Sequence, residues 1–131
     1  MRVVLDSNVL VAAFIARGAC AEVFERVITD HELILSPWLL DELERVLLTK
    51  LRFDEGRSQR ALAVIRRAGT LVDPAPLPEA VCRDPDDDNV LALVRETGAA
   101  CLVTGDDDLL VLDPFEGIPI VTPRRFLTDF G

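Results

Sequence analysis

The sequence has few residues of the kinds that build several common active sites. Its single histidine, His31, lies at the edge of a predicted strand and is expected at the surface, so no Ser–His–acid or Cys–His arrangement can be argued from it. Its three cysteines are an odd number without CxxC spacing, which argues against a disulfide framework or a zinc site. No Rossmann or P-loop glycine pattern occurs either. These absences argue against nucleophilic triads, structural zinc and glycine-loop nucleotide binding.

Long apolar runs are also missing. No run reaches the roughly 18 residues that a membrane-spanning helix requires, and no charged-then-apolar leader opens the chain. Half of the 131 residues are nevertheless apolar, which is enough for a buried core in one domain. We therefore expect residues 1–131 to form a single domain of a soluble, cytoplasmic protein with no membrane partner.

Positive charge is scarce: Lys50 is the only lysine, and the net charge is −9. Nucleic-acid binding usually leaves a basic footprint, so the bulk charge argues against such a partner. Two features weaken that argument. Bound divalent cations would reverse the sign of an acidic site, and the other basic residues are arginines, which grip phosphate through two parallel hydrogen bonds. Net charge therefore does not decide whether the partner is a nucleic acid.

Aspartate, by contrast, is abundant and clustered. Seven of the fourteen aspartates lie in two runs, 84–88 and 106–108. Asp106 directly follows an apolar segment and a Thr-Gly turn, and Asp6 follows another apolar segment. Because parallel strands open a ligand-binding crevice at their carboxyl ends, we expect these acids to gather there. They would repel one another without cations between them, a pattern typical of a hard-metal site with oxygen ligands.

Apolar strand patterns alternate with helical patterns along the chain. This alternation predicts an α/β fold with a mostly parallel sheet and helices on both of its faces. Ser36-Pro37 and Thr122-Pro123 are strong helix starts, in which an N-cap hydroxyl is followed by proline. The segments expected as strands are 2–5, 32–35, 70–72, 100–104 and 118–121.

Several of the polar residues near the predicted site also have a plainer explanation. Asp6 could act only as the N-cap of the next helix, which aspartate does well, and Ser7 and Asn8 could be caps or hydrogen-bonding supports. In a later helix, Glu42 and Glu44 lie on opposite margins of the apolar stripe. Either glutamate could lean into a cleft beside the core or extend to water, and periodicity does not choose between them.

The run 84–88 is harder to explain as a solvated loop. One or two acids suffice to favour a helix N-terminus through its dipole, and the surplus is self-repelling, so we expect at least one of them to have a further role. An EF-hand calcium loop is excluded, because its sixth and twelfth positions would hold Asn89 and Arg95 rather than glycine and glutamate. Asp88 lies farthest into the helix that follows.

Four motifs, taken in order, carry a resemblance to a known family. They are a strand followed by Asp6-Ser7-Asn8, then 36–43, then 84–93, then 102–106. In this order and spacing they resemble the PIN domain family over nearly the whole chain. The resemblance is closest to prokaryotic toxins of toxin–antitoxin pairs, similar to VapC-type toxins. It implies a three-layer α/β/α sandwich with a mostly parallel central sheet.

The resemblance also assigns roles to individual residues. Glu42 is favoured over Glu44 because it directly precedes the apolar Leu43, as in the family pattern. The third acid of the family matches Asp88, with Asp87 as the competitor if the register slips by one. The implied catalytic and metal-binding acids are Asp6, Glu42, Asp88 and Asp106, with Asp108 as an additional metal ligand and with Asn8 and Thr104 as supporting polar residues.

By resemblance, we expect a metal-dependent endoribonuclease that hydrolyses RNA phosphodiester bonds. The implied cofactor is Mg²⁺ or Mn²⁺, and Arg17 and Arg83 are candidates to grip flanking phosphates of the RNA. A toxin of this kind would have an antitoxin as its partner, and homodimers are common in similar proteins. The alternative is a catalytically inactive PIN-fold module that only binds other proteins.

Overall fold

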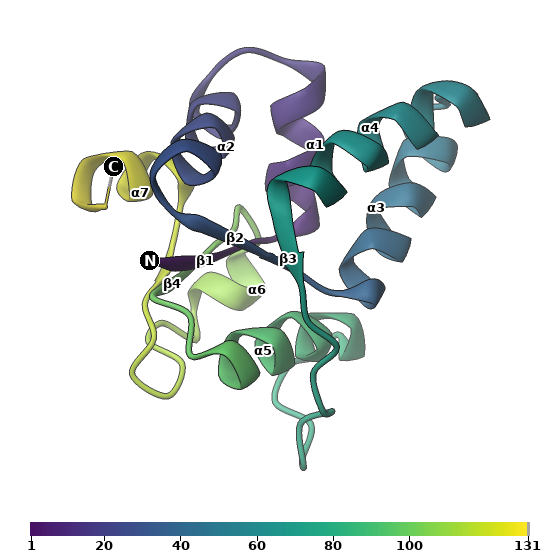
Figure 1. The fold of residues 1–131 in the computed structure, drawn as a ribbon. Coiled ribbons are helices and arrows are strands. Elements are labelled where there is room, and N and C mark those ends of the chain that lie inside the picture. Colours follow the sequence, from purple (N-terminus) through teal and green to yellow (C-terminus); the bar gives the residue numbers. More distant parts are fainter. Residues whose placement is uncertain (131) are drawn as a thin grey trace.

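The computed structural model describes residues 1–130, in which strands alternate with helices (Figure 1). Within that range the strands are β1 (Arg2–Leu5), β2 (Glu32–Leu35), β3 (Gly69–Leu71), β4 (Cys101–Val103) and β5 (Ile120–Val121). The helices are α1 (Ser7–Ile15), α2 (Ala19–Asp30), α3 (Pro37–Thr49), α4 (Glu55–Ala68), α5 (Pro85–Thr97), α6 (Asp107–Leu110) and α7 (Pro123–Asp129). Every predicted strand occurs, although several begin or end a residue or two away from the expected position.

The strands form one sheet in the order β3-β2-β1-β4-β5, and every pairing between neighbours is parallel. β1 lies at the centre, where Val4 pairs with Ile34 of β2 on one side and with Leu102 of β4 on the other. Figure 1 shows α1, α2 and α4 on one side of this sheet and α5 and α6 on the other. The fold is an α/β sandwich, which confirms the expected fold class.

Local sequence signals explain where several helices begin and end. The Ser36 hydroxyl accepts a hydrogen bond of 3.1 Å from the Leu39 N–H, and Pro37 lies in the first turn of α3. Thr122 caps α7 in the same way. Gly98 ends α5 in the left-handed conformation, at φ 56°, which glycine adopts without the steric cost of a Cβ atom. Because these signals involve neighbours in the chain, sequence alone predicts them.

A continuous apolar core joins the helices to the sheet. The last three residues of β1 and of β2 are all buried, because helices cover both faces of a parallel sheet. On α5, the five consecutive residues Val90–Val94 are buried as well. This packing fixes the carboxyl ends of the strands, so the polar residues that follow them are held in defined positions.

Within residues 1–130, no single helix is long and apolar enough to cross a membrane. α1 and α2 reach the required length and composition only when they are taken together, and the pair is bent by 106° at the break between its two helices.

Candidate metal centre

The buried acid Asp6 follows directly after the central strand β1. Its N–H donates to Val103 O of β4 at 2.9 Å, so Asp6 is anchored to the neighbouring strand. Its Oδ1 accepts a hydrogen bond from the Ser7 N–H at 2.8 Å, and its Oδ2 accepts from Asn8 Nδ2 at 3.3 Å and from Thr104 Oγ1 at 2.8 Å. Only 6% of Asp6 is exposed to solvent. Asp6 therefore caps α1 and presents a fixed carboxylate at the carboxyl edge of the sheet.

Thr104 and Asn8 connect the end of β1 to the loop after β4. The buried Thr104 hydroxyl, besides donating to Asp6, accepts a hydrogen bond of 3.0 Å from the Asp106 N–H. Asn8 Oδ1 accepts from the Gly105 N–H at 3.3 Å. These bonds join two segments of the chain that are nearly 100 residues apart in sequence, so that Asp6 and Asp106 lie close to each other.

Three carboxylates converge at this edge of the sheet. Asp87 lies in the first turn of α5, Asp106 is the N-cap of α6, and Asp108 lies in the first turn of α6. One oxygen from each of the three carboxylates lies within 4.8 Å of the other two. The negative charges of Asp106 and Asp6 both act on Asp87. We refer to Asp6, Asp87, Asp106 and Asp108 together as the acidic centre.

Burial and mutual repulsion raise pKa values within the acidic centre. The pKa of Asp87 rises to about 7, first because burial disfavours its charged form and then because Asp106 and Asp6 lie nearby. Burial also raises the pKa of Asp6, against the opposing effect of the hydrogen bonds from Thr104 and Ser7. Without a cation to compensate the charge, Asp87 is therefore partly protonated near neutral pH.

Asp88, the third acid expected from the resemblance, bonds elsewhere. Its carboxylate accepts hydrogen bonds from the backbone N–H groups of Val81 and Cys82, at distances between 2.9 and 3.3 Å. It therefore fastens the loop that precedes α5. The neighbouring residue Asp87, named as the competitor for this role, is the one whose carboxylate meets those of Asp106 and Asp108.

The helical spacing of α5 contained a signal for this difference. Seven residues are about two turns of helix, so side chains at that spacing lie on nearly the same side. Asp87 is seven residues before Val94, which is buried, whereas Asp88 is seven residues before Arg95, which is exposed. Asp87 therefore lies nearer to the side of the helix that packs on the sheet.

Glu42 approaches the acidic centre from α3. Its charge contributes to the raised pKa of Asp6, and its side chain is 19% exposed. The Glu42 carboxylate is paired with Arg45, whose Nε donates to it at 3.2 Å. Glu44 instead accepts a hydrogen bond of 3.0 Å from Gln59 of α4. Of the two glutamates that periodicity left undecided, Glu42 is the one that acts on Asp6.

The donor set of the acidic centre suits a hard divalent cation. Carboxylate oxygens are the ligands that Mg²⁺ and Mn²⁺ prefer in proteins. Arginine side chains pair with other acids, such as Glu42 and Glu116, and none of the ion pairs found among residues 1–130 compensates the four carboxylates of the centre. Asp6, Asp87, Asp106 and Asp108 could therefore hold such an ion, with Glu42 beside them.

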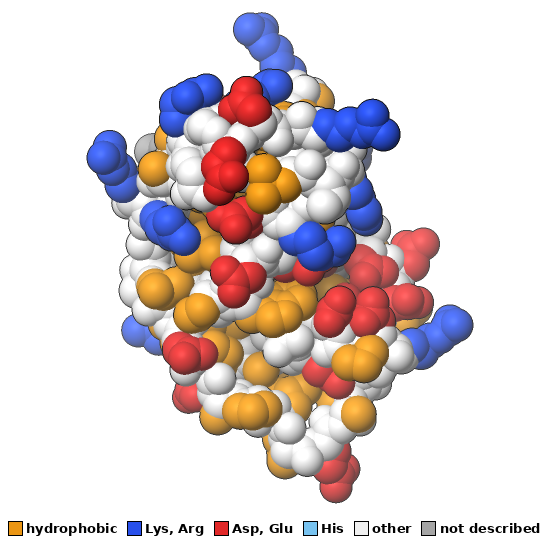
Figure 2. Space-filling model, turned by 90° about the vertical axis from the view of Figure 1, so that its right-hand side faces the viewer, with side chains coloured by type: hydrophobic (Ala, Val, Ile, Leu, Met, Phe, Trp, Pro, Cys, Tyr) orange, Lys and Arg blue, Asp and Glu red, His pale blue; other side chains and the backbone are white. Residues whose placement is uncertain are grey.

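The surface around the centre is divided by charge. Figure 2 views the molecule from the side on which α3 lies in Figure 1; Asp and Glu side chains gather in a group on this face, and several Lys and Arg side chains lie at its upper end. A cavity of about 290 Å³ between α1 and α3 includes Ser7, Asn8 and Glu42 in its lining. Lys50, at the C-terminal end of α3, lines the same cavity. We refer to it as the α1–α3 cavity.

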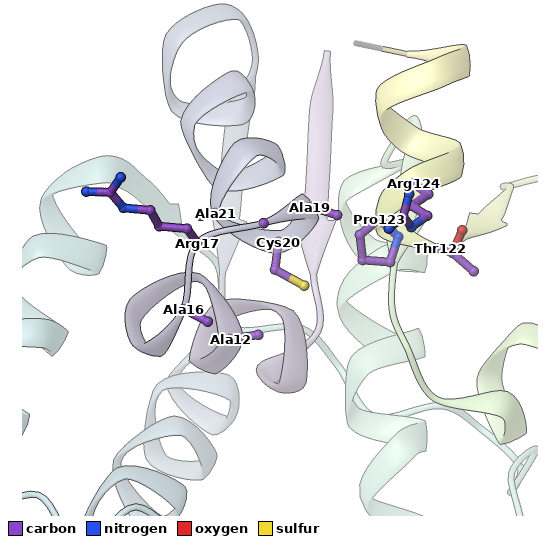
Figure 3. A pocket seen from close by; sticks show the side chains of 10 residues that line it. Ala12, Ala16, Arg17, Ala19, Cys20, Ala21, Thr122, Pro123 and Arg124 are labelled. Carbon is purple, nitrogen blue, oxygen red and sulfur yellow. The ribbon is translucent and has the colours of Figure 1, made fainter.

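A larger cavity, of about 410 Å³, lies between the end of α1, the start of α2 and the start of α7 (Figure 3). Alanine side chains form much of its wall, together with Cys20, Arg17 and Arg124. Of the described residues that line this cavity, none is acidic, so it offers no carboxylate for a hard cation. Arg17, a candidate to grip phosphate, lines this cavity and not the one beside Glu42.

The sequence and the fold define the class of protein. Residues 2–108 match the family model described as PIN domain, and the chain belongs to that family. The family expected from the four motifs is confirmed. One relative spans almost the whole chain: an uncharacterized protein of Methanocaldococcus jannaschii, MJ1680, is 26% identical over 144 residues, which cover 99% of this chain and 92% of that protein.

Solved structures share the fold at low sequence identity. VapBC2 from Rickettsia felis, bound to a DNA fragment of its promoter, has 13% identity and a TM-score of 0.67 over 93% of this chain and 98% of that one. PAE2754 from Pyrobaculum aerophilum has 19% identity and a TM-score of 0.68 over 98% and 88%. VapC20 of Mycobacterium tuberculosis, a sarcin–ricin loop cleaving toxin, has 14% identity and a TM-score of 0.61 over 89% and 99%. The fold is VapC-like.

Proposed function

We propose that residues 1–131 act as a single nuclease domain, a metal-dependent endoribonuclease that hydrolyses RNA phosphodiester bonds. The observation that carries this proposal is the convergence of Asp87, Asp106 and Asp108 within 4.8 Å, close to the buried Asp6. Membership of the PIN domain family supports the same chemistry. Carboxylates assembled in this way, with no arginine or lysine ion pair to them among residues 1–130, are the kind of site that holds a catalytic divalent cation.

In this proposal the residues of the acidic centre hold one or two Mg²⁺ or Mn²⁺ ions. When bound, such an ion lowers the pKa of a coordinated water and stabilises negative charge on phosphate oxygens. Asp6 is oriented by Thr104 and Ser7 before any ligand arrives, so little reorganisation is needed. Glu42 either completes the metal ligands or orients the attacking water.

The proposal uses Asp87 as the third acid in place of Asp88. Two facts support this choice: the Asp87 carboxylate lies with those of Asp106 and Asp108, and the Asp88 carboxylate already accepts backbone hydrogen bonds from Val81 and Cys82. A ligand role for Asp88 would require the loop before α5 to give up those bonds. Asn8 and Thr104 keep the supporting role expected for them.

The biological role that we propose is that of a toxin in a toxin–antitoxin pair. The similarity in fold to VapBC2 and to the toxin VapC20 supports this role. An antitoxin protein would then be the natural partner. The homodimer and the cytoplasmic location expected from the sequence remain predictions, as does the choice between Mg²⁺ and Mn²⁺.

An RNA-cleavage assay tests the proposal directly. Wild-type protein and Asp6→Asn are compared in Mg²⁺, in Mn²⁺ and in EDTA, with intact fold checked by circular dichroism. We expect cleavage by the wild type only with a divalent ion, and a loss of at least about a hundredfold in Asp6→Asn, because the isosteric amide keeps the packing but removes the charge. Equal cleavage by both proteins would reject the site. An absence of cleavage with every ion would favour the inactive interaction module.

A further inference from the structure

The basic residues of this acidic protein are concentrated in one segment. Residues 50–67 contain six of the 14 basic residues and two of the 23 acidic ones, so this segment carries a net charge of +4 in a chain of net charge −9. All six basic side chains are exposed, and none belongs to an ion pair found among residues 1–130. They are Lys50, Arg52, Arg57, Arg60, Arg66 and Arg67.

Two cavities lie along this segment, and one of them reaches Glu42, which lies beside the acidic centre. The α1–α3 cavity includes Glu42 and Lys50 in its lining. A second cavity, of about 250 Å³, is lined by Phe53, Arg57 and Arg60 together with one aromatic and two aliphatic side chains. Only two residues of the chain lie between Lys50 and Phe53. From Glu42 to Lys50 the helix rises by about 12 Å, a distance that a few nucleotides of an extended strand would cover.

Arg57 lines the second cavity, and its side chain packs on an aromatic ring there. Its guanidinium lies 3.9 Å from the centre of the Phe53 ring, a cation–π contact that limits its motion. The backbone N–H of Arg57 donates a hydrogen bond of 2.7 Å to the carboxylate of Asp54, the N-cap of α4, which fixes the start of the helix that carries Arg57. A guanidinium positioned on the Phe53 ring can donate paired hydrogen bonds to a phosphate and can offer its other face to a nucleobase.

We infer that Lys50, Arg57 and Arg60 form a phosphate-binding track that leads single-stranded RNA along α3 to the acidic centre. The inference rests on the proposed ribonuclease function and adds the path of the substrate and the residues that hold it. An unpaired strand fits because stacking on Arg57 requires an exposed base face, and a positive groove with stacking side chains is how proteins bind single strands. An acidic protein segment would match the charge but would leave that stacking surface unused.

Binding without cleavage tests the track. The probe is a fluorescently labelled oligouridylate of about ten nucleotides, measured by anisotropy in EDTA. Arg57→Gln with Arg60→Gln removes two charges from the track, and Arg66→Gln with Arg67→Gln removes two from the other end of the same helix. We expect the first pair to weaken binding about tenfold or more at about 0.1 M salt and to lower the slope of log Kd against log salt by about 1.4. The second pair should change Kd by less than about threefold.

Each outcome decides the question. Equal losses in the two pairs, no loss in the first pair, or no binding by the wild type would overturn the track. Oligoglutamate of equal length competing as well as RNA would identify an acidic protein segment as the occupant and would also overturn it. Binding that depends on Arg57 and Arg60 without any cleavage would reject the nuclease proposal but keep the track. Equal cleavage rates in the wild type and in the Arg57→Gln, Arg60→Gln variant would reject the track but keep the nuclease proposal. Melting temperatures establish that both double variants are folded.

Discussion

The Thr104 hydroxyl donates a hydrogen bond of 2.8 Å to Asp6 Oδ2, although 98 residues of sequence separate the two. The same hydroxyl accepts a hydrogen bond of 3.0 Å from the Asp106 N–H. One neutral side chain therefore fixes the positions of two acids of the acidic centre. Because Thr104 is completely buried, no bulk water is available to replace these bonds.

Thr104→Val should loosen the centre while keeping the shape of the side chain. It leaves the Asp106 N–H without this acceptor and Asp6 without one of its three donors, at a cost of about 1–3 kcal/mol in the free energy of unfolding. Loss of a residue that orients metal ligands should also weaken Mn²⁺ binding about tenfold to a hundredfold. Denaturant unfolding and calorimetric titration measure the two effects. Thr104→Ser keeps the hydroxyl and should retain most of the metal affinity. If both variants bind Mn²⁺ as tightly as the wild type does, the Thr104 hydroxyl has no role in positioning the metal ligands.

Divalent ions should stabilise the wild-type protein. A ligand that binds only the folded state adds about 2.7 kcal/mol at a concentration one hundred times its Kd, which corresponds to a rise of several degrees in melting temperature. We expect this rise with Mg²⁺ or Mn²⁺ and little of it in Asp6→Asn, because the central carboxylate is then missing. Differential scanning fluorimetry gives the comparison. A melting temperature that does not respond to either ion in the wild type would count against a metal site.

Asp87→Asn and Asp88→Asn should have different effects on cleavage and on stability. The comparison decides which of the two residues is the third metal-binding acid. Asp87→Asn removes a carboxylate from the acidic centre, so cleavage and metal affinity should fall sharply, while the loss of repulsion leaves the metal-free fold as stable as before or more so. Asp88→Asn weakens the charge-assisted bonds to Val81 and Cys82, so the stability should fall by about 1–2 kcal/mol with metal affinity largely kept. The reverse result would restore Asp88 as the ligand.

The metal-free protein should lose stability as the pH rises towards neutrality. The pKa of Asp87 is raised from 3.8 to about 7 in the folded state. Between these two values the folded state keeps a proton that the unfolded state has released, so the free energy of unfolding falls with increasing pH. Asp87→Asn should flatten this dependence in EDTA. Metal affinity should change in the opposite direction and increase as Asp87 ionises. Denaturant unfolding curves at several pH values in EDTA test this prediction. A free energy of unfolding that rises steadily towards neutral pH would contradict it.

Glu42→Gln should reduce activity with little effect on stability. The ion pair of Glu42 with the exposed Arg45 contributes at most about 1 kcal/mol. Loss of a residue that orients water or binds an ion should instead lower the cleavage rate by about tenfold to a hundredfold. Glu44→Gln, two residues away and bonded to Gln59, is the matched control and should cleave normally. Equal rates in the two variants would remove Glu42 from the catalytic set.

Much of the candidate site could be proposed from the sequence because its residues occur at the ends of elements. Asp6 and Asp106 each follow a buried apolar strand, and parallel strands bring such positions to one edge whatever the intervening sequence. The third acid was harder to choose, because Asp87 and Asp88 have the same chemistry and lie on the same turn of α5. Their roles separate only through contacts with a distant loop and with Asp106.

The sequence by itself determined the order of the strands and helices, the capped helix starts and the family to which the chain belongs. The elements and caps depend on residues that are close together in the chain, and the family depends on four short motifs taken in order. Only the tertiary structure decided that Asp88 ties down the loop before α5 while Asp87 joins the acidic centre, and that one cavity brings Lys50 of the basic segment together with Glu42 beside that centre. The reason is physical: a carboxylate binds whichever donor or cation the packed chain brings within about 3 Å of it, and side-chain type alone does not fix that neighbour.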